Sequence, residues 1–181
     1  MNNLEKKEIF LDLARKMNQK FSLIPLLHGS LGLQMLIDDE LNPGDVDVAV
    51  PQVYYHLSER WQDLLDFMQS EGYELIDLHE RRFRKDEIQL EFCALDGEKA
   101  GEIPSLEVFA NIDTSKCPII ETDGAIYKHL TLEQYLNIYS SSSEDSYRHR
   151  DIVDNLDKDN ADQIKVKMIQ KALAHGTETE Y

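Results

Sequence analysis

Two aspartates alternate with valines in one short run of the chain, Asp45-Val46-Asp47-Val48, and this pattern constrains the local structure strongly. An extended chain points residues i and i+2 to the same side, so Asp45 and Asp47 share one face, roughly 6–7 Å apart along the strand. The valines take the opposite face. Two carboxylates held in this way repel each other unless a cation lies between them. The run therefore predicts a strand whose polar face either binds a divalent ion such as Mg²⁺, which takes oxygen ligands, or lies on a solvated sheet edge after an ordinary Gly29-Ser30 turn.

A turn precedes this strand. His28-Gly29-Ser30 follows an apolar run over residues 22–27 that predicts a short strand. Gly29 permits a sharp reversal of the backbone. Ser30 is placed to cap a helix over residues 31–38, because its hydroxyl can accept a hydrogen bond from an unpaired backbone N–H group. A helix that begins there favours the binding of phosphate groups.

The two motifs together resemble the signature of a known family. A Gly29-Ser30 turn, a gap of about one helix and the Asp-Val-Asp-Val run resemble the nucleotidyltransferase superfamily, which has the polymerase-beta-like fold. Its most similar members are small bacterial proteins, namely antibiotic nucleotidyltransferases and those of toxin–antitoxin and abortive-infection systems. The resemblance implies an α+β fold, with a nucleotidyltransferase-like mixed sheet flanked by helices. It also implies a catalytic domain over residues 1–129 and a C-terminal helical region over residues 130–181.

The resemblance also assigns roles to these residues. Asp45 and Asp47 would be catalytic residues that bind metal, with two Mg²⁺ ions expected. Gly29 and Ser30 would be nucleotide-binding residues that hold the nucleoside triphosphate, and ATP is the expected donor. Some antibiotic-modifying members carry Arg or His just before the two acids, where this chain has Asn-Pro-Gly at 42–44. A charged contact from that position is therefore not expected.

A third carboxylate is expected on a strand beside the first two. In family members this acid lies between hydrophobic residues, and Glu91 matches, with Leu90 before it and Phe92 after it in a predicted strand over residues 87–95. The chain has Glu where Asp is more frequent, so its side chain is one methylene longer. Glu91 would complete a metal site and accept the proton of the attacking hydroxyl. The alternative is a solvent-facing strand residue without a catalytic role.

Basic residues gather before this strand, at residues 81–85. Arg82 and Arg84 alternate on one predicted strand and are interpreted as nucleotide-binding residues that face the triphosphate. The alternative is that they protect an exposed sheet edge. In the helical tail, Arg148 and Arg150 resemble a family pattern and are expected to reach the cleft.

Composition excludes several classes of function. With 181 residues, the chain is expected to form one domain, with or without a helical appendage. It has no apolar run near the ~20 residues that a membrane span needs and no secretory signal, so we expect a cytoplasmic protein without a membrane partner. Cys93 and Cys117 lack metal-binding spacing and are expected to stay reduced. A net charge of −16 argues against general nucleic-acid binding, which relies on Lys and Arg, and suits a cationic small-molecule acceptor or a basic protein partner.

Periodicity predicts the remaining elements. Helices are expected over residues 3–20, 54–70, 131–140, 144–157 and 161–174, and strands over 73–78, 81–85, 106–109 and 125–129. The serines at 140–143 predict a loop between two tail helices. Exposed apolar residues on these tail helices would allow a homodimer.

The resemblance implies a metal-dependent nucleotidyltransferase. It would move a nucleoside monophosphate, AMP from ATP, to a hydroxyl group of an unidentified small molecule or macromolecule and release pyrophosphate. One alternative is a non-catalytic member that serves as a binding or regulatory module, for example in a toxin–antitoxin pair. Another is a hydrolase or phosphotransferase that uses the same acids.

Overall fold

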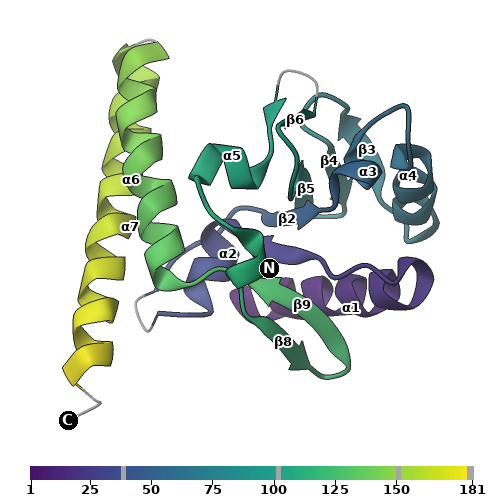
Figure 1. Cartoon of the computed structure of the whole chain (residues 1–181), viewed down its shortest axis with the longest axis horizontal. Helices are drawn as coiled ribbons and strands as arrows, with labels where there is room; N and C mark the ends of the chain where they lie inside the picture. Colours follow the sequence, from purple (N-terminus) through teal and green to yellow (C-terminus); the bar gives the residue numbers. More distant parts are fainter. Residues whose placement is uncertain (38–39, 101–102, 150–151, 179–181) are drawn as a thin grey trace.

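The structure is a computed structural model of the chain (Figure 1), and it describes all residues except 38–39, 101–102, 150–151 and 179–181. At 99–100, 141–149, 152–161 and 176–178 it describes the backbone but not the side chains.

A mixed sheet of seven strands forms the centre of the described chain. In spatial order its strands are β3 (Glu74–Asp77), β4 (Arg82–Lys85), β5 (Ile88–Ala94), β2 (Val46–Val50), β1 (Leu26–His28), β9 (Ala125–His129) and β8 (Ile119–Thr122). β2 pairs with β5, and β1 with β9, in parallel, while the other neighbours are antiparallel. A small ribbon of β6 (Lys99–Ala100) and β7 (Ile103–Pro104) lies apart. The predicted mixed sheet is confirmed.

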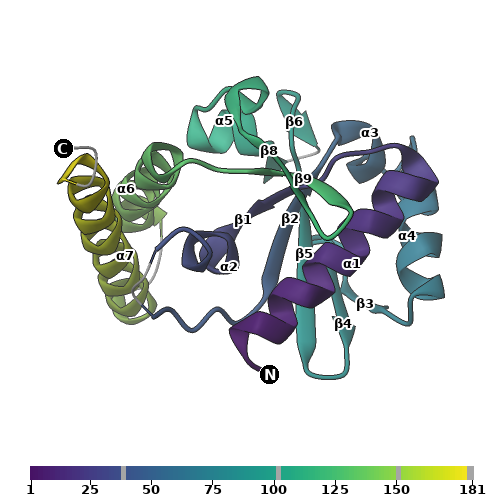
Figure 2. The ribbon, with the colours of Figure 1, turned by 90° about the horizontal axis from the view of Figure 1, so that it is seen from below.

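Helices cover both faces of this sheet, which confirms the α+β class (Figure 2). One face packs against α1 (Asn3–Phe21) and α4 (Trp61–Ser70). On the other side lie α2 (Gly29–Gln34), α5 (Leu106–Ala110), α6 (Leu132–His149) and α7 (Ile152–Glu178). The short α3 (Gln52–Tyr55) and a 3₁₀ turn (Thr114–Lys116) complete the described helices. Since α6 and α7 form an antiparallel pair beside the sheet, the C-terminal region is helical, as predicted.

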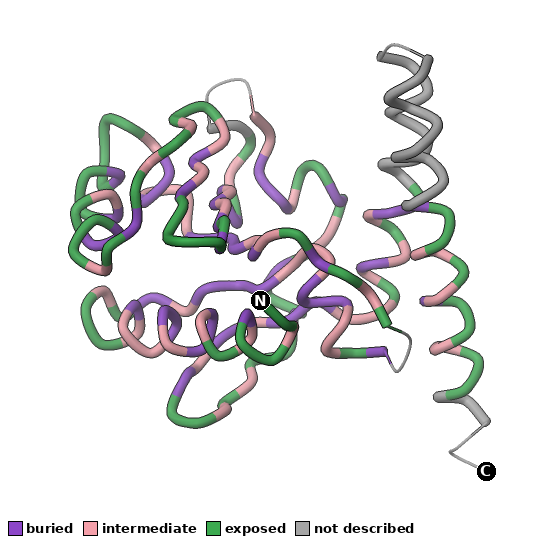
Figure 3. The backbone as a smooth tube through the Cα atoms, turned by 180° about the vertical axis from the view of Figure 1, so that it is seen from behind, coloured by how far each residue is buried: buried purple, intermediate pink, exposed green. Residues whose placement is uncertain are grey.

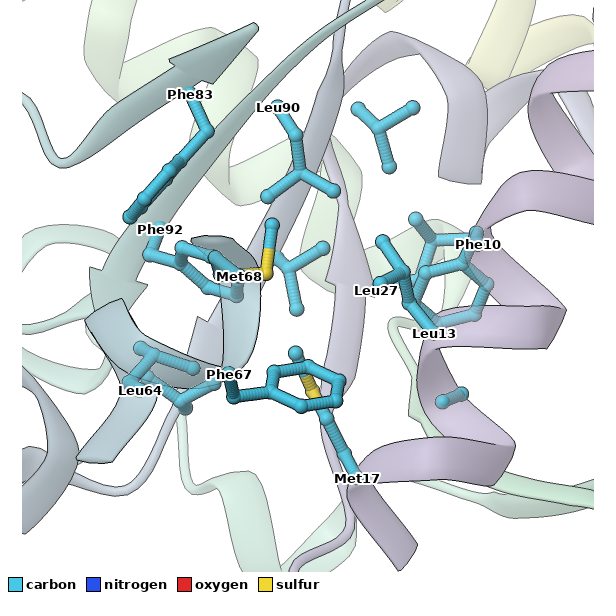
Figure 4. Close-up of a cluster of buried hydrophobic side chains, with 14 of the residues drawn as sticks. Phe10, Leu13, Met17, Leu27, Leu64, Phe67, Met68, Phe83, Leu90 and Phe92 are labelled. Atoms are coloured by element: carbon cyan, nitrogen blue, oxygen red, sulfur yellow. The ribbon is translucent and has the colours of Figure 1, made fainter. Parts of the chain in front are cut away.

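The face toward α1 and α4 holds the larger apolar core (Figure 4). Val46, Val48 and Val50 of β2 point into it and are at most 2% exposed. They pack with side chains from α1, α4, β4 and β5 that include Phe10, Leu13, Met17, Leu64, Phe67, Met68, Phe83, Leu90 and Phe92. Burial is concentrated along the central strands, whereas the loops at the rim are exposed (Figure 3). Because burial of apolar area is the main stabilising contribution, this core fixes the position of β2.

A second core joins the opposite face to the tail helices. Leu26 and Ala49, on the central strands, share an apolar cluster with Tyr135 and Tyr139 of α6 and Ile169 of α7. All five side chains are at most 8% exposed. The tail helices are therefore packed against the sheet, although the predicted division of the chain at residue 129 stays a prediction.

Two predictions about local structure are wrong. Residues 106–109 form part of helix α5 instead of a strand, because Ser105 caps the helix by accepting a hydrogen bond from the Val108 N–H at 3.3 Å. The expected loop at 140–143 lies inside α6, which continues to His149. Residues 106–109 have side chains typical of a strand, but the Ser105 cap starts a helix there. The serines at 140–143 are typical of a loop, but the helix on either side continues through them.

Three further elements differ from the sequence-based expectation. Ser30 is not an N-cap, because α2 begins at Gly29, two residues before the expected start at residue 31, and ends at Gln34. The expected helix over 54–70 is divided into α3 and α4. The sequence did not predict strand β8, which pairs with β9 at the sheet edge.

Candidate functional site

The candidate site is built on one row of residues that crosses four neighbouring strands. His28 on β1 is opposite Asp47 on β2, Asp47 is opposite Glu91 on β5, and Glu91 is opposite Arg82 on β4. Residues in register on neighbouring strands point to the same face of a sheet. The row therefore carries an imidazole, two carboxylates and a guanidinium side by side, on the face away from α1 and α4.

The two acids of this row lie close to the third predicted acid, Asp45. One carboxylate oxygen each of Asp45, Asp47 and Glu91 lie within 4.8 Å of one another. Asp45 comes directly before β2, and the parallel pairing of β2 with β5 sets Glu91 beside Asp47. A set of three carboxylates at such separations fits a hard divalent cation, since its donors are all oxygen atoms.

Gly29 lies directly against the acids. Its φ is +67°, and a Cβ atom at this position would lie 1.9 Å from Oδ2 of Asp47. No side chain fits there, so the turn requires glycine for both space and conformation. Ser30 lines the same pocket, and its side chain hydrogen bonds with Tyr139 of α6. Both predicted nucleotide-binding residues of the turn therefore border the acids.

The two predicted arginines lie in different surroundings. Arg82 donates two hydrogen bonds to Oε2 of Glu91, from Nε at 3.2 Å and from Nη2 at 2.9 Å. Arg84 is two residues further along β4 and pairs with the exposed Glu74 at 3.2 Å. The structure thus brings Arg82, but not Arg84, to the acids. Arg148 and Arg150 lie outside the residues whose side chains the structure describes.

Burial and repulsion perturb the protonation of the row. Burial, followed by the charges of Asp45 and Glu91, raises the pKa of Asp47 to about 8. Burial also raises the pKa of Glu91, although the hydrogen bonds from Arg82 oppose this effect. The cluster therefore favours a bound proton or a bound cation, which is the electrostatic behaviour of a cation site.

A neutral pair lies at the other end of the row. Burial lowers the pKa of His28 to about 4, so its imidazole is uncharged at neutral pH. Its Nε2 atom lies 3.3 Å from Sγ of Cys93, and burial raises the pKa of that thiol. Both cysteines are free, as predicted. Of the two basic side chains in the row, Arg82 is therefore the one that is positively charged at neutral pH.

A pocket of about 400 Å³ opens over the acids and includes residues that the sequence did not indicate. α5 contributes Phe109, α6 contributes Tyr139, and α7 contributes Asp162 and Lys165. Nζ of Lys165 lies 4.7 Å from the centre of the Tyr139 ring and 4.0 Å from Oδ1 of Asp162. These residues are distant from the motifs in the sequence, so no local pattern reveals them. His28 could have been recognised, because it comes directly before the Gly-Ser turn.

A second hollow, of about 460 Å³, lies between α1 and the β4–β5 hairpin. Its main cations are already paired. Lys16 bonds with Asp12 and Glu71, and Lys85 donates to the Glu71 carbonyl oxygen at 2.7 Å. This hollow is slightly larger, but in the described part of the chain Asp45, Asp47 and Glu91 are the acids found close enough together to share a metal ion. We therefore assign the candidate site to the pocket over the sheet.

Comparison with known proteins identifies a bacterial relative. No protein-family model matches the chain. The uncharacterized protein YnaI of Bacillus subtilis (strain 168) is 33% identical over 164 residues, which cover 91% of this chain and 95% of YnaI. The chain belongs to the YnaI family. Since YnaI is uncharacterized, this relationship assigns no activity.

Solved structures show the fold. The solution structure of the antibiotic-resistance factor ANT(2'')-Ia matches with a TM-score of 0.52 and 13% sequence identity, over 99% of this chain and 96% of that protein. A crystal structure of ANT(2'')-Ia with adenylyl-2''-tobramycin gives a TM-score of 0.48, also at 13% identity, over 98% and 99%. The match to the solution structure shows that the YnaI-family chain has the fold of ANT(2'')-Ia, which is the nucleotidyltransferase-like fold that the sequence motifs predicted. None of the helices in its described part has the length and apolar character needed to cross a membrane.

Proposed function

We propose that this protein is a metal-dependent nucleotidyltransferase that transfers AMP from ATP to a hydroxyl group and releases pyrophosphate. The observation that carries the proposal is the convergence of Asp45, Asp47 and Glu91 within 4.8 Å, directly beside the Gly29 turn. The fold shared with ANT(2'')-Ia supports this assignment. The pocket over the acids provides room for a nucleotide and part of an acceptor.

The three acids and the two residues of the turn each have a role in this proposal. Asp45, Asp47 and Glu91 hold divalent metal, for which Mg²⁺, as two ions, fits the oxygen donors. When bound, the metal stabilises negative charge on the entering and leaving oxygens. Gly29 and Ser30 border the nucleotide phosphates. Glu91 accepts the proton of the attacking hydroxyl, because its raised pKa brings a carboxylate closer to the range of a general base.

The charge of the pocket suggests the acceptor class. The described lining of the pocket contains three carboxylates, from Asp45, Asp47 and Asp162, and one lysine, Lys165. With a net charge of −16 on the chain, a cationic hydroxyl compound or a basic protein is favoured over nucleic acid, which needs a basic surface. We propose a cytoplasmic protein with such an acceptor.

The test measures ATP-dependent pyrophosphate release in the presence of Mg²⁺, together with transfer of label from the α-phosphate of ATP. The panel of acceptors contains aminoglycosides, neutral sugars and basic proteins. Asp45→Asn and Asp47→Asn should each abolish pyrophosphate release while the protein stays folded. Activity retained in either variant, or release of free phosphate in place of pyrophosphate, would refute the proposal.

Calorimetry with MgATP separates catalysis from simple binding. A non-catalytic regulatory module would show no metal-dependent ATP binding in the wild type. The proposed enzyme should bind MgATP, and Asp47→Asn should weaken the binding, because it removes one of the oxygen donors.

A further inference from the structure

Arg82 donates two hydrogen bonds to the carboxylate of Glu91. Both Nε and Nη2 donate to the same oxygen, Oε2 of Glu91, at 3.2 and 2.9 Å. The two side chains are opposite each other in the β4–β5 register and are only partly exposed, at 35% and 26%. A planar guanidinium with two donors on one acceptor fixes the orientation of the carboxylate more firmly than one flexible donor would.

This contact leaves the second carboxylate oxygen available. Both hydrogen bonds recorded for Glu91 end on Oε2, and within the described part of the chain no hydrogen bond to Oε1 is found. Glu91 has three side-chain torsions and is partly exposed on the same face of the sheet as Asp47, so without a partner it would sample several orientations. The distance to the Asp45 and Asp47 oxygens depends on which of these orientations it adopts.

We propose that Arg82 is a positioning residue, which holds the Glu91 carboxylate against Asp45 and Asp47 so that the three acids form one cation site, and that it is not a nucleotide contact. This inference rests on the proposed function and refines it. Arg84, two residues along the same strand and on the same face, bonds with the exposed Glu74 instead. It therefore provides a matched comparison within the same strand.

A role through charge alone predicts the opposite effect. Arg82 carries a positive charge beside three carboxylates, so Coulomb's law predicts that its removal strengthens the binding of a cation. A positioning role predicts that removal weakens it, because the loss of a residue that orients a metal ligand typically lowers metal affinity about 10- to 100-fold. The sign of the change thus separates the two roles.

The experiment is a calorimetric titration of the full-length protein with Mn²⁺, without nucleotide. The variants are Arg82→Met, which removes charge and donors, Arg82→Lys, which keeps the charge, and Arg84→Met as the control. We expect Mn²⁺ affinity to fall about tenfold or more in Arg82→Met and by a smaller factor in Arg82→Lys. Arg84→Met should keep the wild-type value. Arg82→Met that binds Mn²⁺ as tightly as the wild type, or more tightly, overturns the proposal.

A second background controls for a general loss of structure. If Arg82 acts through Glu91, Arg82→Met should cause no further loss of Mn²⁺ affinity in a Glu91→Gln protein, because the two residues would act as one unit. An equal further loss would show that Arg82 acts independently and would overturn the proposal. The melting temperature of each variant shows whether the fold is intact.

Different results would contradict the proposed function and the positioning role of Arg82. If the wild type binds no Mn²⁺, or if Asp47→Asn binds it equally well, the three acids are not a cation site, and both proposals fall. If Asp47→Asn weakens Mn²⁺ binding but Arg82→Met has the Mn²⁺ affinity of the wild type, only the positioning role is wrong. If Arg82→Met weakens ATP binding at unchanged Mn²⁺ affinity, Arg82 is a nucleotide contact and the positioning role is wrong.

Discussion

The two faces of the central sheet differ although the same strands build both. In β5, Leu90 points into the core against α1 and α4 and has no exposed surface, while the next residue, Glu91, points to the opposite face and lies beside Asp45 and Asp47. In β2, Val48 and Asp47 divide in the same way. One face holds the larger apolar core, whereas the other combines the repelling charges with the smaller apolar cluster beneath α6 and α7. The comparison shows that stability and proposed chemistry are separated by one residue along a strand.

The strongest test of this separation is the Glu91→Gln variant. We expect kcat for pyrophosphate release to fall at least about 100-fold, since Glu91 is the proposed base. The unfolding free energy should not decrease, because the substitution also removes a repulsive charge from the row. Gln89→Ala, at an exposed position on the same face of β5, is the control and should retain activity. A large loss of stability in Glu91→Gln would contradict the division between the faces.

The reverse test is the Leu90→Ala variant on the core face. Truncation of a fully buried leucine typically costs about 2–5 kcal/mol, which urea unfolding can measure. Below the melting temperature, the folded fraction should bind Mn²⁺ with wild-type affinity. Leu90→Met conserves the volume and should cost less than about 1.5 kcal/mol. Equal effects of Leu90→Ala and Glu91→Gln on Mn²⁺ binding would show that the two faces are not independent.

Gly29 tests whether the turn and the acids form one unit. Alanine at this position would require a left-handed backbone and would place its Cβ 1.9 Å from Asp47 Oδ2. We expect Gly29→Ala to lower the unfolding free energy by about 1–3 kcal/mol and to weaken Mn²⁺ binding. Gly44→Ala is the control, because its Cβ would meet nothing within 4 Å. If both variants behave alike in the Mn²⁺ titration, the turn does not shape the site.

The pH dependence of stability should show the smallest effect. The pKa of Asp47 is raised from 3.8 to about 8, so the folded protein binds an extra proton between these values, and its unfolding free energy falls as pH rises. His28, with its pKa lowered from 6.5 to about 4, acts in the opposite direction, but only below pH 6.5. From pH 6.5 to 8, without metal, the wild type should therefore lose more stability than Asp47→Asn. Thermal unfolding at several pH values measures the difference, and parallel curves would contradict it.

The sequence predicted those parts of the site that depend on residues close together in the chain. The alternation around Asp45 and Asp47 depends only on strand geometry, and the motif order pointed to the correct fold. It also indicated Glu91, although the parallel pairing of β2 with β5 is needed to set that residue beside Asp47. Whether these residues act as proposed stays a prediction.

The sequence could not predict contacts made across long distances in the chain. Lys165 and Tyr139 enter the pocket only because α6 and α7 pack against the sheet. Arg82 and Arg84 have the same local pattern, but only the β4–β5 register places Arg82 opposite Glu91. Residues 106–109 have strand-like side chains, yet the Ser105 cap starts a helix there. In each case tertiary packing or a single cap outweighs the amino-acid pattern.

The tail helices contribute residues to the pocket over the acids and cover part of the central sheet. A protein shortened to residues 1–129 would keep all three acids and the Gly29 turn, but the pocket over the acids would lose Tyr139 and Lys165 from its lining. It would also expose Leu26 and Ala49, which α6 and α7 now help to cover. In such a fragment the acids would be more exposed to solvent. An inactive fragment would therefore not be evidence against the proposed roles of the three acids.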